Sequence, residues 1–191
     1  MVIQQRLYTL AEFEQLLQLP ENQERLLELI NGEVVEKATT EEHGIPITEL
    51  IFFLRAFLEK TGLGGMVLSN VHYRAPHDDQ NVRLPDVSYI GPRDRDPVSR
   101  GAAPEIPDLC VEVKSPSNSY KQLREKARFY LANGARLIWL IIPQRRQVEV
   151  YAPDFEDVLD ETQTLSGRAV LPGFELPVCA LFVNPLRSSE A

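Results

Sequence analysis

The chain has 191 residues, of which 20 are Lys or Arg and 28 are Asp or Glu, so its formal net charge is −8 at pH 7. Its 43% apolar and 25% charged residues are typical of a globular protein and exclude disordered, collagen-like and coiled-coil chains. The negative charge argues against a nonspecific nucleic-acid binder, because phosphate contacts depend on Lys and Arg, but it is compatible with a local basic face.

The sequence contains no apolar stretch long enough to span a membrane, and its first residues lack the pattern of a secretion signal. Cys110 and Cys179 lie in apolar runs far apart in the sequence, which predicts two buried, reduced thiols. There are 3 His and no Cys-x-x-Cys motif, so we expect no zinc site. Together these features favour a cytoplasmic protein without membrane contact.

The first third of the chain shows clear signals for two helices and a hairpin. Thr9 and Glu12 have capping-box spacing, which predicts a short helix over residues 10–19 that ends at Pro20. Asn31-Gly32 separates two β-prone runs, which is typical of a hairpin with a type I′ turn. Residues 41–61 carry an apolar stripe and precede Gly62, so they predict a long helix, which Pro46 either opens or kinks.

The remaining two thirds predict strands around one more helix. Residues 66–75 and 82–90 form two strands, and residues 91–107 form a polar loop. Residues 118–133 form a helix, with Ser117 or Ser119 as N-cap and Gly134 after its end. Further strands are expected at residues 108–114, 136–142 and 147–151 and near Thr164 and Ala169, with an acidic segment at 154–161.

No repeat or linker interrupts this pattern. We therefore predict a single α/β domain with a mixed sheet over residues 1–191, to which the helix at residues 9–19 and the tail at residues 183–191 are peripheral. Phosphate-binding, dinucleotide-binding and hydrolase-elbow motifs are absent from the sequence.

Two short segments carry the candidate chemistry: Pro85-Asp86 at one strand, and Glu112-Val113-Lys114 at another. Because side chains alternate along a strand, Glu112 and Lys114 share one face while Val111 and Val113 occupy the other. These two charges form either a structural pair or a frayed strand end, or they belong to a site. Asp86 favours the site, since carboxylates from two strands can share a hard divalent cation and a lysine can position the attacking water.

The order of these motifs resembles the Uma-type restriction endonuclease family of the PD-(D/E)XK nuclease superfamily, which has the restriction-endonuclease-like fold. The resemblance covers roughly residues 24–182. Besides Asp86 and Glu112, it rests on residues 29–33, His43, residues 84–89, 107–109 and 115–117, Lys126 with Tyr130, Trp139-Leu140, and residues 171–174.

The resemblance implies a role for each matching residue. Asp86 and Glu112 would bind Mg²⁺ or Mn²⁺, and Lys114 would act as the base, although many relatives carry an apolar residue at that position. Glu33 is the first candidate for a third acidic ligand, with Glu28 and Glu49 behind it; as a hairpin residue it is equally compatible with a solvated role. His43 would orient substrate or a ligand, or have no catalytic role.

The helix that follows Lys114 is basic. Lys121, Arg124, Lys126, Arg128 and the nearby Arg136, set against Glu125, give this stretch a net charge of +4, whereas residues 21–42 carry −5. Lys126 and Gln122 lie one helical turn apart, so both are candidates for substrate contacts.

We therefore expect a metal-dependent endonuclease that hydrolyses DNA phosphodiester bonds and forms a homodimer. The alternative is a catalytically silent nucleic-acid-binding or protein-interaction module on the same fold.

Overall fold

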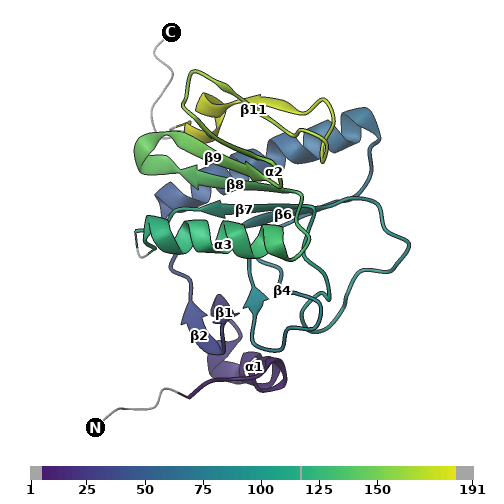
Figure 1. The fold of residues 1–191 in the computed structure, drawn as a ribbon, viewed down its shortest axis with the longest axis vertical. Coiled ribbons are helices and arrows are strands. Elements are labelled where there is room, and N and C mark those ends of the chain that lie inside the picture. Colours follow the sequence, from purple (N-terminus) through teal and green to yellow (C-terminus); the bar gives the residue numbers. More distant parts are fainter. Residues whose placement is uncertain (1–5, 117, 184–191) are drawn as a thin grey trace.

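The computed structural model describes residues 6–116 and 118–183, and its centre is a six-stranded mixed sheet between two helices (Figure 1). The strand order is β10-β9-β8-β7-β6-β3, in which only β7 and β8 are parallel. The bounds of these strands are β3 Met66–Leu68, β6 Val87–Ile90, β7 Leu109–Val113, β8 Leu137–Ile142, β9 Gln147–Ala152 and β10 Phe155–Leu159. The predicted mixed sheet is confirmed.

Each face of this sheet is covered by one long helix. Leu50 and Leu54 of α2 (Glu41–Thr61) pack with Val111 on one face, and Leu123 and Ala127 of α3 (Tyr120–Ala132) pack on the other. Because β7 alternates, its Leu109, Val111 and Val113 face α2, which leaves Cys110 and Glu112 facing α3. A carboxylate thus lies in an otherwise apolar interface between sheet and helix.

A smaller antiparallel sheet, in the order β2-β1-β5-β4, lies with α1 (Leu10–Leu17) at one end of the molecule (Figure 1). Its strands are β1 Leu27–Ile30, β2 Glu33–Glu36, β4 Tyr73–Arg74 and β5 Val82–Arg83. Asn31 and Gly32 have φ values of 51° and 81°, so the predicted hairpin turn is confirmed.

The two long strands predicted at residues 66–75 and 82–90 are each split in two. Asn70, with φ 51°, separates β3 from β4, and residues 84–86 separate β5 from β6, so the halves join different sheets. This prediction was wrong in extent, because a positive φ and a proline interrupt the extended backbone. The break places Asp86 at the junction of the two sheets.

The helices agree with the sequence to within two residues. Thr9 forms the predicted capping box with Glu12, and α1 ends at Leu17, before Pro20. Pro46 lies inside α2, and Gly62 caps that helix in the left-handed conformation. Ser119 is the N-cap of α3, whereas Ser117 lies outside the described residues.

The C-terminal part differs more from expectation. The acidic segment contains the edge strand β10, and β11 (Thr164–Ser166) pairs with β12 (Glu175–Pro177), while Ala169 lies in a turn. An edge strand leaves one side in water, so acidic residues are tolerated there. Most of the predicted tail, residues 184–191, lies outside the described residues.

Of the two cysteines, Cys110 is buried as predicted, whereas Cys179 is exposed. The second prediction was wrong because the apolar run around Cys179 forms a short 3₁₀ helix, Val178–Phe182, that buries Val178 and Leu181 instead. Within the described ranges, no helix is long and apolar enough to cross a membrane.

Candidate active site

Asp86 and Glu112 lie side by side where the two sheets meet. The backbone N–H of Asp86 donates to the Val111 carbonyl at 3.0 Å, and Asp86 Oδ2 accepts a hydrogen bond from the Val113 N–H at 2.7 Å. Asp86 is 1% exposed and Glu112 is fully buried. The two carboxylates lie together, as expected for acids on neighbouring strands, and both are buried.

A lysine from the hairpin lies between these carboxylates. Lys37, directly after β2, donates from Nζ to Asp86 Oδ1 at 2.6 Å and to the Leu84 carbonyl at 2.7 Å. Its Nζ is also 3.5 Å from Glu112 Oε2. The Lys37 ammonium thus supplies a positive charge at the point that both carboxylates face.

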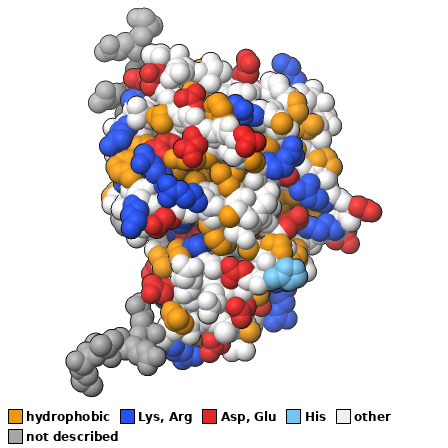
Figure 2. Space-filling view, in the orientation of Figure 1, with side chains coloured by type: hydrophobic (Ala, Val, Ile, Leu, Met, Phe, Trp, Pro, Cys, Tyr) orange, Lys and Arg blue, Asp and Glu red, His pale blue; other side chains and the backbone are white. Residues whose placement is uncertain are grey.

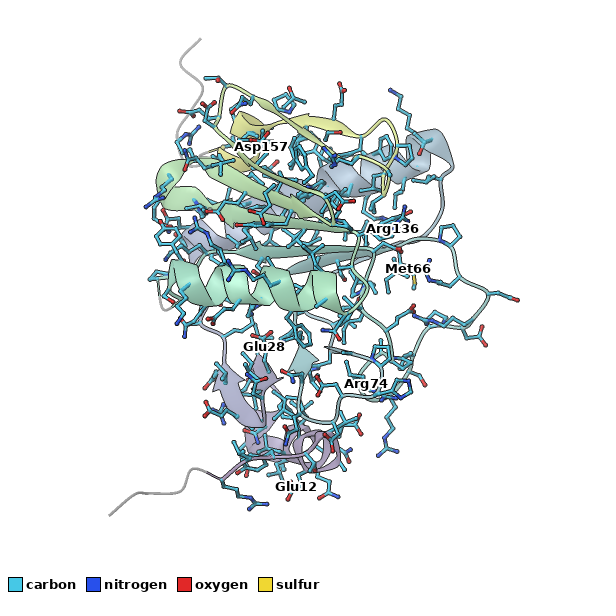
Figure 3. The ribbon with its side chains drawn as sticks, in the orientation of Figure 1. Glu12, Glu28, Met66, Arg74, Arg136 and Asp157 are labelled. Atoms are coloured by element: carbon cyan, nitrogen blue, oxygen red, sulfur yellow. The ribbon has the colours of Figure 1, made fainter. Side chains whose placement is uncertain are left out.

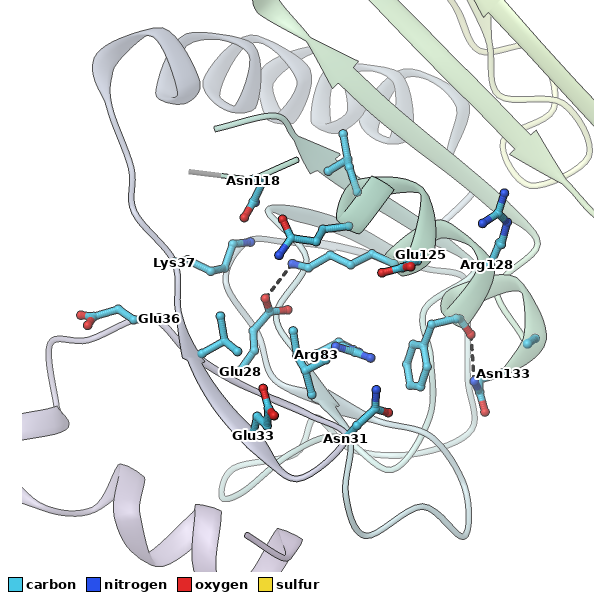
Figure 4. Close-up of a pocket in the computed structure, with 17 residues that line it drawn as sticks. Glu28, Asn31, Glu33, Glu36, Lys37, Arg83, Asn118, Glu125, Arg128 and Asn133 are labelled. Atoms are coloured by element: carbon cyan, nitrogen blue, oxygen red, sulfur yellow. Dashed lines mark hydrogen bonds and ion pairs between the residues drawn. The ribbon is translucent and has the colours of Figure 1, made fainter. Parts of the chain in front are cut away.

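A second lysine links Glu112 to a third buried carboxylate. Lys126 on α3 donates to Glu28 Oε2 at 2.6 Å and to Glu112 Oε2 at 3.1 Å. The other oxygen of Glu28 accepts the Leu84 N–H at 2.9 Å. Figure 3 shows Glu28 between the small sheet and α3, and the dashed line that ends at Glu28 in Figure 4 marks this hydrogen bond from Lys126.

Two further side chains complete the contacts of the carboxylates. His43, in the first turn of α2, is 3% exposed, and its Nε2 lies 3.3 Å from Asp86 Oδ2. The Tyr130 hydroxyl donates to Glu112 Oε1 at 2.7 Å. Every carboxylate oxygen of Asp86 and Glu112 thus has a polar partner, which a buried carboxylate requires.

The charges of this cluster influence one another. Burial is the largest single influence on Asp86 and Glu28, and by itself it raises the pKa of both. The charge of Lys37 and the contact with His43 together outweigh it at Asp86, and the charges of Lys126 and Lys37 with the hydrogen bonds outweigh it at Glu28, so both pKa values lie below their ordinary values. Burial likewise lowers the pKa of Lys37, but the charges of Glu112, Asp86 and Glu28 hold that pKa above its ordinary value. Asp86 and Glu28 are therefore ionised at neutral pH.

Burial, followed by the negative charge of Glu112, raises the pKa of Tyr130 well above its ordinary value. Tyr130 therefore stays protonated and can only donate its hydroxyl hydrogen to Glu112.

Three predicted site residues are not brought to the carboxylates. β7 ends at Val113, so Lys114 lies beyond the strand; its Nζ donates to the Ser115 carbonyl at 3.1 Å and lies 5.0 Å from the Tyr120 ring centroid. Glu33 is exposed on β2. Gln122 is exposed, and it caps α3 through the backbone of Ser119.

The sequence analysis did not predict Lys37 as a site residue, and it placed Glu28 behind Glu33. Neither residue is linked to Asp86 by a short sequence motif. Lys126 and Tyr130 are different: four residues apart on one helix, they share a face, and both contact Glu112. This i, i+4 pair of polar side chains within an apolar stripe is the sequence feature that indicates contact with the buried site.

A pocket of 680 Å³ opens beside the cluster, between the hairpin and α3 (Figure 4). Glu28, Lys37 and Lys126 reach its wall, and Glu33 and Gln122 also line it. Figure 2 shows Lys and Arg side chains gathered around α3, with acidic and apolar side chains among them. The charged cluster is therefore reached from the side of the molecule that the basic helix covers.

Comparisons with known proteins agree with this architecture. Residues 13–179 match the Uma2 family, which is described as "Putative restriction endonuclease". A solved structure, "a putative nuclease belonging to DUF820 from Anabaena variabilis ATCC 29413", is similar with a TM-score of 0.76 and 23% identity. The similarity covers 91% of this chain and 97% of that one, so the two share a fold.

No curated protein matches the sequence. The family match spans most of the chain and both motifs of the buried cluster. The chain therefore belongs to the Uma2 family.

Proposed function

We propose that the protein is a divalent-cation-dependent endonuclease that hydrolyses DNA phosphodiester bonds, with Asp86 and Glu112 as its metal ligands. One observation carries the proposal: the two buried carboxylates already share a cation, the Lys37 ammonium, at 2.6 and 3.5 Å. Two carboxylates that together bind an ammonium group are also suited to bind a divalent cation.

The donor set fits Mg²⁺ or Mn²⁺. Carboxylate oxygens are ligands for hard cations, and Mg²⁺ keeps several waters and often takes only one or two protein carboxylates. Among residues 6–116 and 118–183, no three His, Cys, Asp or Glu side chains form a complete cage. The pair Asp86 and Glu112 therefore fits a partly hydrated cation. Glu28, which Lys126 links to Glu112, is the better candidate for a third acid than the exposed Glu33.

A bound divalent cation would supply Lewis-acid chemistry at the phosphate and lower the pKa of a water. The chain's own residues would position the water and the phosphate. The Lys126 ammonium contacts Glu112 and also lines the pocket, where it can hold a water or offset the charge on the phosphate. Tyr130 and His43 fix the orientation of the two carboxylates.

A homodimer, a single domain and a cytoplasmic location belong to the same proposal and rest on the sequence alone. Cleavage of both DNA strands needs two such sites, which is the reason for expecting a dimer.

The test is cleavage of supercoiled plasmid and single-stranded DNA by the full chain with Mg²⁺ or Mn²⁺, with and without chelator. We expect chelator-sensitive nicking that Asp86→Asn and Glu112→Gln abolish while both variants remain folded. Cleavage that persists at the wild-type rate in both variants would reject the site assignment.

A second function, nucleic-acid binding without cleavage, is favoured by one feature of the cluster. Its three carboxylates, those of Asp86, Glu112 and Glu28, are already paired with Lys37 and Lys126. The cluster is therefore close to neutral without a metal. Binding of oligonucleotides with no cleavage and no Mn²⁺ binding would support this function over the first.

A further inference from the structure

Arg83, three residues before Asp86, is a buried cation that pairs with no anionic side chain in the part of the chain that the structure describes. Its exposed fraction is 5%, and among the described residues its Nε and Nη1 atoms have no hydrogen-bond partner. Its Nη2 donates to Asn81 Oδ1 at 2.9 Å, and the Phe129 ring centroid lies 4.3 Å from its Cζ. A buried charge in this state costs free energy, because these N–H groups are closed to bulk solvent and no carboxylate of the described residues pairs with the guanidinium.

The acid beside it does not compensate Arg83. Glu28 lines the same pocket, but its two oxygens are occupied by the Leu84 N–H and by Lys126. Figure 4 shows Arg83 deep in the pocket, among Glu28, Asn31 and Asn133. The missing partner is therefore expected from outside the chain, through the pocket.

We propose that Arg83 is an anion-binding residue that takes a backbone phosphate of the nucleic acid, next to the phosphate that is cut. This inference rests on the proposed function for the identity of its ligand. One N–H of Nη2 donates to Asn81. Its other N–H forms a planar fork with the unpartnered Nε or Nη1 on the same side, so the guanidinium keeps one open fork that matches two oxygens of a phosphate. Arg83 shares this pocket with Lys37 and Lys126, the two lysines that contact Asp86 and Glu112.

Phe129 controls access to the guanidinium. Its ring packs on one face of Arg83 and is itself only half-buried, while Nε and Nη1 are closed to solvent. A phosphate reaches Nε and Nη1 when the Phe129 side chain changes rotamer. These N–H groups, which have no partner before binding, then donate charge-assisted hydrogen bonds to the phosphate. The buried Arg83 charge therefore lowers the stability of the free protein, and binding of a phosphate removes this destabilisation.

The test compares wild type, Arg83→Met and Arg83→Lys. The first measurement is the Tm of the full chain in phosphate and in chloride at matched ionic strength. Phosphate should raise the Tm of wild type, raise that of Arg83→Lys less, and leave that of Arg83→Met unchanged. Without phosphate, Arg83→Met should be at least as stable as wild type, because it removes an uncompensated buried charge.

The second measurement is oligonucleotide affinity in EDTA, by fluorescence anisotropy. Arg83→Met should weaken binding about ten- to a hundredfold and reduce the salt slope by about 1. Arg168→Met is the matched control, because Arg168 also lies over an aromatic ring, Phe155, but is exposed and outside the pocket. It should behave as wild type in both measurements.

The inference is overturned if phosphate stabilises wild type and Arg83→Met equally or stabilises neither, or if Arg83→Met loses stability but not affinity. If Arg83→Met does not fold, Arg83→Lys decides, since it keeps the charge and loses the fork. Arg83-dependent anion binding in a protein that cleaves nothing would reject the nuclease and keep the anion site. Metal-dependent cleavage with an unchanged KM in Arg83→Met would keep the nuclease and reject the inference.

Discussion

The Lys37 ammonium lies 2.6 Å from Asp86 Oδ1, although the two residues are 49 positions apart in the chain. The hairpin formed by β1 and β2 delivers this lysine into a site whose carboxylates come from the junction of two sheets. Its side chain is 6% exposed, so the contact is a buried ion pair rather than a surface pair. A cation supplied by the chain therefore balances the carboxylates that we propose as metal ligands.

Lys37→Met should destabilise the protein, because it leaves Asp86 and Glu112 without their shared cation. Breaking a buried ion pair by removing one partner costs about 3–5 kcal/mol. Mn²⁺ should then raise the Tm of Lys37→Met more than that of wild type, since the added cation no longer competes with the ammonium. Scanning calorimetry with Mn²⁺ and with EDTA measures both effects.

Lys121→Met is the control for this experiment, because Lys121 is 85% exposed and pairs loosely with Glu125 at 3.8 Å. It should leave both Tm values unchanged. A Mn²⁺ response in Lys37→Met no larger than that of wild type would show that the ammonium and the metal do not share a position.

Lys126→Met should reduce DNA cleavage about 10²- to 10³-fold, as expected for the loss of one charged donor at the reacting phosphate. Lys114→Met should reduce it far less, because the Lys114 ammonium lies over Tyr120 and bonds the Ser115 carbonyl. Rates under single-turnover conditions with Mg²⁺ distinguish the two lysines.

Each variant needs a matched stability measurement, since Lys126 also pairs with Glu28. The reverse ranking, with Lys114→Met inactive and Lys126→Met active, would restore the role that the Glu-Val-Lys motif predicts for Lys114.

The sequence predicted the parts of the fold that depend on local signals. The Asn31-Gly32 turn, the capping box of α1, the serine N-cap of α3 and the apolar β8 strand each need only a few adjacent residues to specify them. The splitting of the two long strands was not predicted. Which sheet each half joins depends on the strand with which that half pairs. That is a long-range property, and strand propensity does not encode it.

The same distinction holds for the site. Asp86 and Glu112 were predicted because each lies in a recognisable motif, whereas Lys37 and Glu28 reach them only through the packing of the hairpin. The positive charge that the sequence predicted for α3 is also partly compensated by packing that the sequence did not reveal. Arg124 is paired with Glu149 at 2.7 Å, so part of that charge is already neutralised within the chain.

Glu28→Gln and Glu33→Gln should separate the two candidates for the third acid. Glu28 is buried and is the closer of the two carboxylates that pair with Lys126, so its neutral variant breaks a buried ion pair and should cost about 3–5 kcal/mol. Glu33 is exposed, so Glu33→Gln should change the stability by less than about 0.5 kcal/mol.

Mn²⁺ titration of both variants completes this comparison. Weaker binding in Glu28→Gln, with Glu33→Gln unchanged, is the expected result. Loss of Mn²⁺ affinity in Glu33→Gln alone would instead support Glu33 as the third ligand.

His72 should make the protein less stable as the pH falls below neutrality. Burial is the main cause that lowers the pKa of His72, and its Nε2 lies 2.8 Å from the Leu27 carbonyl, an arrangement that suits the neutral ring as donor. Between the lowered folded pKa and the unfolded value of about 6.5, the unfolded chain binds more protons, so stability rises with pH and is lost on acidification. Urea unfolding from about pH 7.5 to about pH 5.5 should therefore show a steeper loss in wild type than in His72→Gln, whose amide can still donate to Leu27. His77→Asn, at an exposed position with φ 63°, should keep the wild-type slope; equal slopes in all three proteins would mean that His72 does not titrate with unfolding.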